Sequence, residues 1–282
     1  MATESLTDNP SAATDVLDMV VCRGLSKTFG NLTAVHSMDL CIRKGELFGF
    51  LGPNGAGKTT TIKMLTGLLH PTAGTASIGG FDIQREPLAA KRILGYIPDN
   101  PFLYEKLSGR EYLGFMADLY SVPKEDRARR IPELLRLFEL EAKGGELIQS
   151  YSRGMRQKIA LAGALIHTPQ VIFLDEPTVG LDPKGARAMR DILRELCRRG
   201  VTVFMSTHIL EVAERTCDRV AIVNQGRIVI QGTMEELRAQ RREAALVEGS
   251  PDEPDDGKRS LEEIFLELTD DNQTADLAQY LS

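Results

Sequence analysis

The hydrophobic residues of this chain fall into short continuous runs that alternate with longer, helically spaced stretches. Residues 47–51 (Leu-Phe-Gly-Phe-Leu) and 171–174 (Val-Ile-Phe-Leu) are apolar throughout, which is typical of strands buried on both faces of a sheet. Helical patterns follow these runs at 60–69 and 182–199, and a further apolar run at 201–206 predicts another strand. This order of elements predicts an α/β fold whose sheet is mostly parallel.

The pattern differs near the start of the chain. Short apolar stretches between residues 19 and 42 are broken by Gly24, Gly30 and Asn31, and they predict strands of a small sheet. Residues 75–83, with Gly79-Gly80 in the middle, predict a hairpin. We therefore expect an antiparallel β-subdomain at the N-terminal side of the core.

A helical pattern interrupts the alternation over residues 100–150. Ser108 and Glu111 form a capping-box pair that begins one helix, and Pro123 begins a second with apolar residues on one face. No strand pattern separates these two helices, so we predict an inserted α-helical subdomain. Beyond it, residues 155–167 predict the helix with which the alternation resumes.

The two ends of the chain are acidic. Residues 1–18 are polar and predict a disordered tail with no signal-peptide core. Residues 246–259 predict an acidic linker, and 260–282 an amphipathic helix and tail. The apolar stripe of that helix must be buried on this domain, on a second copy or on another protein. The predicted core domain thus spans residues 19–245.

Residues 52–59, Gly-Pro-Asn-Gly-Ala-Gly-Lys-Thr, match a phosphate-binding loop between a predicted strand and a predicted helix. The glycines let the backbone approach a ligand, and the loop amides and the helix N-terminus attract an anion. Lys58 would reach the β- and γ-phosphates, and the Thr59 hydroxyl would bind Mg²⁺. The predicted contacts with the nucleoside triphosphate are Gly52, Asn54, Gly55, Ala56, Gly57, Lys58, Thr59 and Thr60.

Two carboxylates follow the apolar run at 171–174. Asp175 can anchor Mg²⁺ beside Thr59, and Glu176 can orient or deprotonate an attacking water. His208 follows a second apolar strand. By itself such a histidine is more often structural, but beside Asp175, Glu176 and Lys58 a contact with the γ-phosphate is the better interpretation.

Composition narrows the class of protein. The 282 residues carry a net charge of −6, with 42% hydrophobic residues and no Trp. No uncharged apolar run approaches the roughly 18 residues that span a bilayer. We find no basic stripe with interleaved aromatic residues, so nucleic-acid binding is not expected. The scattered cysteines lack metal-site spacing and indicate reduced thiols: Cys22, Cys41, Cys197 and Cys217.

With these motifs in order, residues 19–245 resemble the nucleotide-binding subunit of ATP-binding cassette (ABC) transporters. The most specific stretch is 151–158 (Tyr-Ser-Arg-Gly-Met-Arg-Gln-Lys), which resembles the family's signature loop; it is followed by Phe-Leu-Asp-Glu-Pro-Thr at 173–178. Residues 179–182, ending in Asp182, are similar to the loop that touches the opposing subunit. The fold that the resemblance implies is a P-loop NTPase core.

The resemblance also implies roles for single residues. Phe29 would stack on adenine, Glu176 would be the catalytic base, and His208 would hold water and γ-phosphate in register. Ser152 and Gly154 would cap the γ-phosphate bound by another subunit, so that a complete site needs two subunits facing head to tail. ATP would close this pair, and hydrolysis would reopen it.

Two positions depart from the family pattern. Tyr-Ser-Arg-Gly-Met at 151–155 stands where Leu-Ser-Gly-Gly-Gln is common, and it resembles the variant in exporters of the ABC-2 type. Asp99 stands where the family usually has a Gln that reaches Mg²⁺ at the contact with the membrane subunit. The expected metal set is therefore Thr59, Asp175 and Asp99, with the shorter, negative Asp99 altering reach and coupling.

These implications favour an ATP-hydrolysing subunit that powers a multisubunit membrane transporter, with export as the favoured direction. The partners implied are a separate membrane-spanning permease and a second nucleotide-binding subunit, the same or different. The implied location is cytoplasmic, peripheral on the cytoplasmic face of the membrane. The alternative is a soluble ABC-family ATPase acting on nucleic acid or ribosomes, which the single phosphate loop and the lack of a heptad run disfavour.

Overall fold

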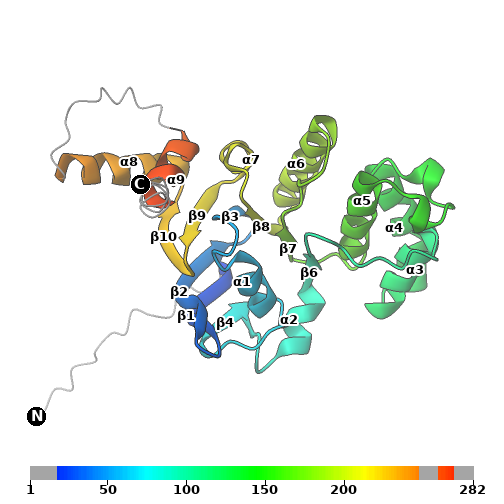
Figure 1. The fold of residues 1–282 in the computed structure, drawn as a ribbon. Coiled ribbons are helices and arrows are strands. Elements are labelled where there is room, and N and C mark those ends of the chain that lie inside the picture. Colours follow the sequence, from blue (N-terminus) through cyan, green and yellow to red (C-terminus); the bar gives the residue numbers. More distant parts are fainter. Residues whose placement is uncertain (1–17, 248–259, 270–282) are drawn as a thin grey trace, which may run out of the picture.

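The computed structural model describes residues 18–247 and 260–269 of the chain. In Figure 1 these residues form two sheets at the centre with helices on several sides. Most of the predicted tail (1–18), most of the predicted linker (246–259) and the last residues, 270–282, lie outside the described residues. Among the described residues, no helix combines the length and the apolar character needed to cross a membrane.

The larger sheet has six strands in the order β10-β9-β3-β8-β7-β6, and all neighbours are parallel except β9 and β10. This confirms the predicted α/β class and the mostly parallel sheet. The bounds, across the sheet, are β10 (Arg227–Gly232), β9 (Arg219–Asn224), β3 (Leu47–Leu51), β8 (Thr202–Thr207), β7 (Val171–Asp175) and β6 (Leu94–Ile97).

The smaller sheet is antiparallel, as predicted, in the order β2-β1-β4-β5. Its strands are β1 (Asp18–Phe29), β2 (Leu32–Arg43), β4 (Ala73–Ile78) and β5 (Phe81–Asp82). The prediction that Gly24 breaks a strand was wrong. Gly24 lies inside β1 at a register shift with a φ of +57°, so the strand bulges and continues. Gly30 and Asn31 form the tight turn between β1 and β2.

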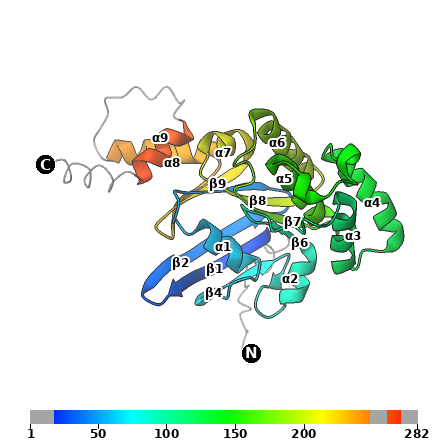
Figure 2. The same cartoon turned by 45° about the vertical axis from the view of Figure 1, so that its right-hand side comes forward.

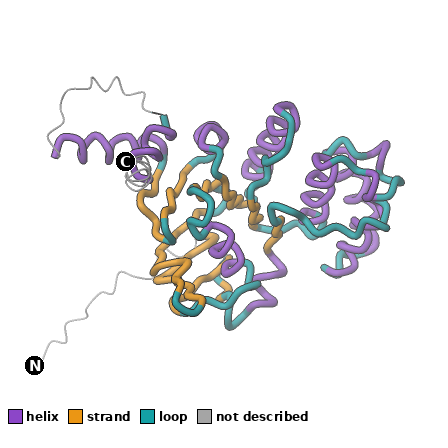
Figure 3. Tube along the Cα trace, viewed as in Figure 1, coloured by secondary structure: helices purple, strands orange, loops and turns teal. Residues whose placement is uncertain are grey.

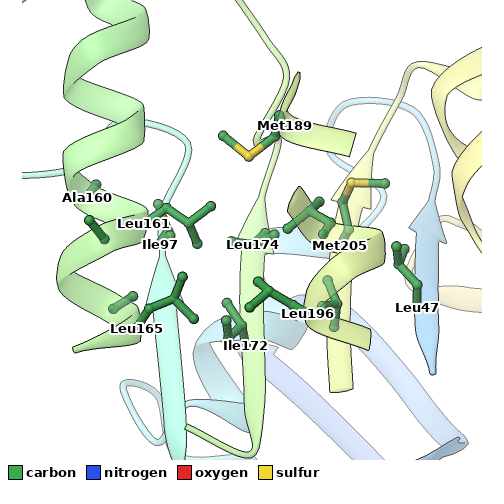
Figure 4. Packing of buried hydrophobic residues seen from close by; sticks show 14 of the residues in the cluster. Leu47, Ile97, Ala160, Leu161, Leu165, Ile172, Leu174, Met189, Leu196 and Met205 are labelled. Carbon is green, nitrogen blue, oxygen red and sulfur yellow. The ribbon is translucent and has the colours of Figure 1, made fainter. Parts of the chain in front are cut away.

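Hydrophobic residues of the six-stranded sheet alternate between its two faces, as the period of a strand requires. In β7, Ile172 and Leu174 pack with helix residues such as Leu161 and Met189, as Figure 4 shows. Val171 and Phe173 belong to the cluster on the other face, which the smaller sheet and α1 (Lys58–Leu65) cover. Figure 2 shows α1 beside that smaller sheet. Because both faces are buried, the strand sequences are apolar throughout.

Three helices lie together beyond the β6 edge of the large sheet: α3 (Gly109–Leu119), α4 (Lys124–Leu137) and α5 (Arg153–Leu165). They are the purple segments on the right of Figure 3. The capping box at Ser108 and Glu111 is confirmed, with both reciprocal hydrogen bonds present. Short 3₁₀ turns at Glu141–Lys143 and Ile148–Ser150 join α4 to α5.

Two helix starts differ from the predictions, and one helix was missed. The helices α1 and α5 begin at Lys58 and Arg153 rather than at 60 and 155, since a helix starts with polar residues before its apolar face becomes visible in the pattern. The helix α2 (Pro87–Ile93) was not predicted. It is short and buries only Ala90, so it has almost no apolar period.

The remaining helices lie on different parts of the large sheet. The helix α6 (Pro183–Arg198) packs on β8 and β3, α7 (Leu210–Thr216) contacts β3, and α8 (Met234–Val247) contacts β10 and α9 (Leu261–Thr269). The helix α9 begins with a second capping box, in which Ser260 and Glu263 exchange hydrogen bonds. Its Leu261 and Ile264 are fully buried, and it packs on α7 and α8. The sequence allowed three partners for the apolar stripe of this helix: this domain, a second copy or another protein. In the structure, its Leu261 and Ile264 are buried on the same chain.

Candidate active site at the edge of the parallel sheet

The C-terminal ends of β3, β7 and β8 meet at one edge of the large sheet, because neighbouring parallel strands share a direction. The predicted phosphate loop connects β3 to α1 at this edge. The predicted carboxylates stand there too: Asp175 ends β7, and Glu176 follows it. Three segments far apart in the sequence are thus brought to one place by the sheet.

The glycines of the phosphate loop are required by close backbone contacts. A Cβ on Gly52 would lie 2.3 Å from the carbonyl oxygen of Val223. A Cβ on Gly57, whose φ is +99°, would lie 2.6 Å from the carbonyl oxygen of Ala34. Side chains at these positions would push the loop away from the strands that support it.

Lys58 is buried, with 7% of its side chain exposed, and it is held across the loop. Its Nζ donates hydrogen bonds to the carbonyl oxygens of Gly52 (2.7 Å) and Pro53 (3.2 Å), and it lies 3.7 Å from Oε1 of Glu176. The ammonium group therefore stands between the loop backbone and the carboxylate that follows β7.

Asp175 is anchored on both carboxylate oxygens. Thr59 Oγ1 donates to its Oδ2 at 2.8 Å, and Ser206 Oγ donates to its Oδ1. The group is 3% exposed. A hydroxyl and a carboxylate are the hard oxygen donors that Mg²⁺ prefers, so this pair fits a magnesium ion.

Ser206 is a site residue that we did not predict. It is fully buried and lies opposite Asp175 in the register of β7 and β8. The available signal was the hydroxyl of Ser206 at the end of the run 201–206, which also contains Thr202, but the pattern of a single strand does not reveal which residue lies opposite it.

Glu176 has a backbone conformation that is uncommon for a residue with a side chain, with a φ of +51°. Its N–H donates to the Ser206 carbonyl oxygen at 3.1 Å. Its Oε1 lies 2.9 Å from Nδ1 of His208, and its Oε2 is buried without a hydrogen bond in the described part of the chain. This carboxylate also lines the cavity at the phosphate loop, and a general base needs such a position within reach of the attacking water.

A cavity of about 260 Å³ opens beside these groups. Asp99 lines its wall together with the phosphate loop, so the structure brings this predicted metal residue to the same place. The other lining residues are Ala34, Asn54, Gly55, Gly57, Lys58, Thr59, Thr60, Asp175 and Glu176. Burial, with the charge of Asp175 as a second cause, raises the pKa of the nearby Tyr96 phenol to about 12, so that phenol stays neutral.

Three predicted residues lie in a different cavity, of about 490 Å³. Ser152 is the N-cap of α5 and accepts a hydrogen bond from the Met155 N–H at 3.3 Å. Asp182 is the N-cap of α6 and accepts from the Gly185 N–H at 2.9 Å. Gly154 lines the same cavity, and no residue of the phosphate loop does. Within one chain, the two sets of predicted phosphate contacts are therefore separate.

Phe29 also lies away from the phosphate cavity. It is 47% exposed at the turn between β1 and β2, and the Lys27 ammonium is 5.0 Å from its ring centroid. It does not line the 260 Å³ cavity, which Ala34 on β2 reaches instead. An adenine contact by Phe29 stays a prediction.

A family model described as ABC transporter matches residues 35–179. An uncharacterized ABC transporter ATP-binding protein of Nostoc sp. is 43% identical over 211 residues, which cover 73% of this chain and 62% of the relative. The daunorubicin resistance ATP-binding protein DrrA3 of Streptomyces coeruleorubidus is 40% identical over 217 residues, covering 77% and 69%. The chain thus spans somewhat under two thirds of the first relative's length.

Solved structures of the same class share the fold. One, described as the structure of the ATP binding subunit of an ABC transporter, has a TM-score of 0.78 and 34% identity, covering 89% of this chain and 99% of its own. Another is the dimeric post-hydrolysis state of the ATP-binding cassette MJ0796 bound to ADP and Pi, with a TM-score of 0.71 and 26% identity, covering 77% and 99%.

Proposed function

The chain belongs to the ABC transporter family, whose ATP-binding subunits are ATPases, and on this premise we propose that it powers a multisubunit exporter by hydrolysing ATP. The observation that carries the proposal is the Glu176 carboxylate, which lies 2.9 Å from His208 and 3.7 Å from Lys58 beside the phosphate loop. Residues 19–245 form the nucleotide-binding domain in this proposal.

Each group at the sheet edge has a role in hydrolysis. Glu176 accepts a proton from the attacking water, and His208 holds the carboxylate in the orientation that its 2.9 Å contact provides. Lys58 and the loop amides hold the phosphates. Thr59 and Asp175 would hold Mg²⁺, with Asp99 within the same cavity; when bound, the ion neutralises phosphate charge.

We propose that the site is completed by a second nucleotide-binding subunit, the same or different. Ser152 and Gly154 lie at the N-terminus of α5, where free N–H groups attract an anion, yet they face another cavity than the phosphate loop. Head-to-tail pairing would place them on a facing subunit's γ-phosphate. ATP would then favour the closed pair, and loss of the γ-phosphate the open one.

Two further observations support the proposal of export and of a membrane partner. The printed name of the Streptomyces relative refers to daunorubicin resistance. Three residues after Asp99 in the chain, Phe102 is 95% exposed, and the exposed rings of Tyr104 and Phe115 meet edge to face with centroids 4.9 Å apart. Exposed apolar surface of this kind is typical of an interaction site. We propose that it docks a separate permease, which would place the chain on the cytoplasmic face of the membrane.

Replacing the proposed base tests the ATPase mechanism. Glu176→Gln should retain ATP binding but lose hydrolysis by about 10²- to 10⁴-fold, and it should accumulate as a closed dimer. The matched control is Glu262→Gln on the exposed side of α9, which should leave turnover unchanged. Unaltered turnover in Glu176→Gln would show that this residue is not the base.

Replacing an exposed aromatic tests the partner. Affinity purification from detergent-solubilised membranes should recover a permease with the wild-type chain. Phe102→Ala should lose the permease while keeping ATP binding, and Leu119→Ala, another exposed apolar residue, should keep it. A chain that hydrolyses ATP fully yet associates with no membrane protein would refute the transport proposal. ATPase activity stimulated by DNA or ribosomes would instead favour the soluble alternative.

A further inference from the structure

The C-terminal helix α9 lies next to the element that carries His208. His208 and Ile209 are the two residues between the end of β8 and the start of α7, and the Ile209 N–H donates to Thr207 Oγ1 at 3.0 Å. Such a short, hydrogen-bonded connection passes any shift of α7 directly to His208. Figures 1 and 2 both show α9 beside α7.

The helix α7 is short and only partly buried. It has seven residues, of which Ala213 and Thr216 are buried, while Leu210 and Val212 are partly buried against the hydrophobic cluster and the helix also contacts β3. Isolated helices of this length are unstable in water and depend on packing. Its position therefore depends on the elements that cover it.

Two helices from the C-terminal part of the chain, α8 and α9, pack on α7. On α8, Arg238 donates to Glu214 Oε1 of α7 at 3.0 Å, and Leu237 is fully buried. On α9, Leu261 and Ile264 are fully buried in the same hydrophobic cluster that contains Ala213 of α7. The apolar stripe of α9 therefore packs with α7 rather than being left for a partner.

We propose that α9 is a positioning element of the hydrolysis site: by packing on α7 it fixes the start of that helix, and with it the His208 ring that contacts Glu176. This inference rests on the proposed ATPase function. It assigns α9 a role in turnover rather than in subunit contact, with Leu261 and Ile264 as positioning residues.

A pair of identical substitutions on opposite sides of α9 tests the proposal. Leu261→Ala removes a fully buried side chain, and Leu266→Ala removes one that is 46% exposed. We expect Leu261→Ala to lower kcat by about 10-fold or more, since a misplacement of about 1 Å can cost about 10²-fold. Equilibrium ATP binding should not change, because none of the residues that line the cavity at the phosphate loop belongs to α9. Leu266→Ala should match the wild type in both.

A double-mutant cycle separates positioning from general destabilisation. If α9 acts through His208, Leu261→Ala should cause no further loss of kcat in a His208→Ala background. Ile264→Val, a smaller change, should lower kcat in the same direction, so that the proposal does not depend on one variant that folds poorly. An additive loss in the cycle, or an unchanged kcat in both α9 variants, overturns the positioning role.

The outcomes distinguish this inference from the proposed function. A wild-type chain that does not hydrolyse ATP, or an unchanged kcat in His208→Ala, contradicts the proposed site itself. Hydrolysis that depends on His208 but not on Leu261 or Ile264 overturns only the role of α9.

Discussion

Ser206 holds together the two carboxylate residues of the site, and its replacement is the most direct test of that geometry. Its Oγ donates to Asp175 Oδ1 and accepts the Glu176 N–H at 3.3 Å. The side chain is fully buried, so water cannot replace the lost hydroxyl. Ser206→Ala should therefore leave a buried carboxylate oxygen without its donor.

The loss in the free energy of unfolding depends on which contacts of Ser206 are kept by alanine. A hydrogen bond to a charged group contributes about 1.5–3 kcal/mol, and the bond to Asp175 is of this kind. The second contact adds little, because the Glu176 N–H also donates to the Ser206 carbonyl oxygen at 3.1 Å. We expect the free energy of unfolding to fall by about 1.5–3 kcal/mol, or Tm by about 3–12 °C.

Urea unfolding followed by circular dichroism measures this change, with Ser150→Ala as the control. The Ser150 hydroxyl is exposed and donates to the Leu147 carbonyl oxygen at 2.7 Å, so its loss should cost less than about 0.5 kcal/mol. Weaker binding of ATP in the presence of Mg²⁺ should accompany Ser206→Ala. Equal losses in the two variants would refute the claim that Ser206 anchors Asp175.

Three further predictions concern the loop, a helix cap and a thiol. Gly52→Ala should abolish ATP binding, because its Cβ would lie 2.3 Å from a carbonyl oxygen; Gly114→Ala, with open space around it, should bind normally and raise the free energy of unfolding by about 0.5–1 kcal/mol. Ser108→Ala should cost about 1 kcal/mol at neutral pH and less near pH 3. Hydrogen bonds from the backbone N–H and the hydroxyl of Ser108 lower the pKa of Glu111 in the folded chain, and alanine removes only the hydroxyl. The contribution of the hydroxyl is present above the carboxyl's unfolded pKa and is lost as pH falls through the folded value. Urea titrations at the two pH values check this. Burial raises the pKa of the Cys22 thiol to about 12, so it should react with Ellman's reagent only in urea.

Local features of the chain could be predicted from the sequence because their causes are local. The strand Leu47–Leu51 is apolar throughout because both of its faces are covered. The capping box at Ser108 joins residues three apart, so spacing alone reveals it. The phosphate loop likewise combines its glycines and Lys58 within eight residues, between a strand and a helix that were both predicted.

Other features depend on which residues lie opposite each other. Ser206 meets Asp175 only because β7 and β8 are neighbours in register, and no pattern within either strand contains that information. A glycine such as Gly24 often ends a strand. Here β1 pairs with both β2 and β4 on either side of Gly24, so the strand continues past this residue as a bulge. The spacing of apolar residues along α9 likewise did not show which surface they pack against.

The sequence alone determined the class of the protein, the order of its main elements apart from α2, and the chemical groups available to a nucleotide, since periodicity, caps and loop glycines act over a few residues. Only the tertiary structure decided which groups meet. It placed Asp175 between Thr59 and Ser206, separated Ser152 from the phosphate loop, and buried α9 against α7. The physical reason is that strand order and helix packing join segments distant in the chain, and a local pattern carries no record of its distant partner.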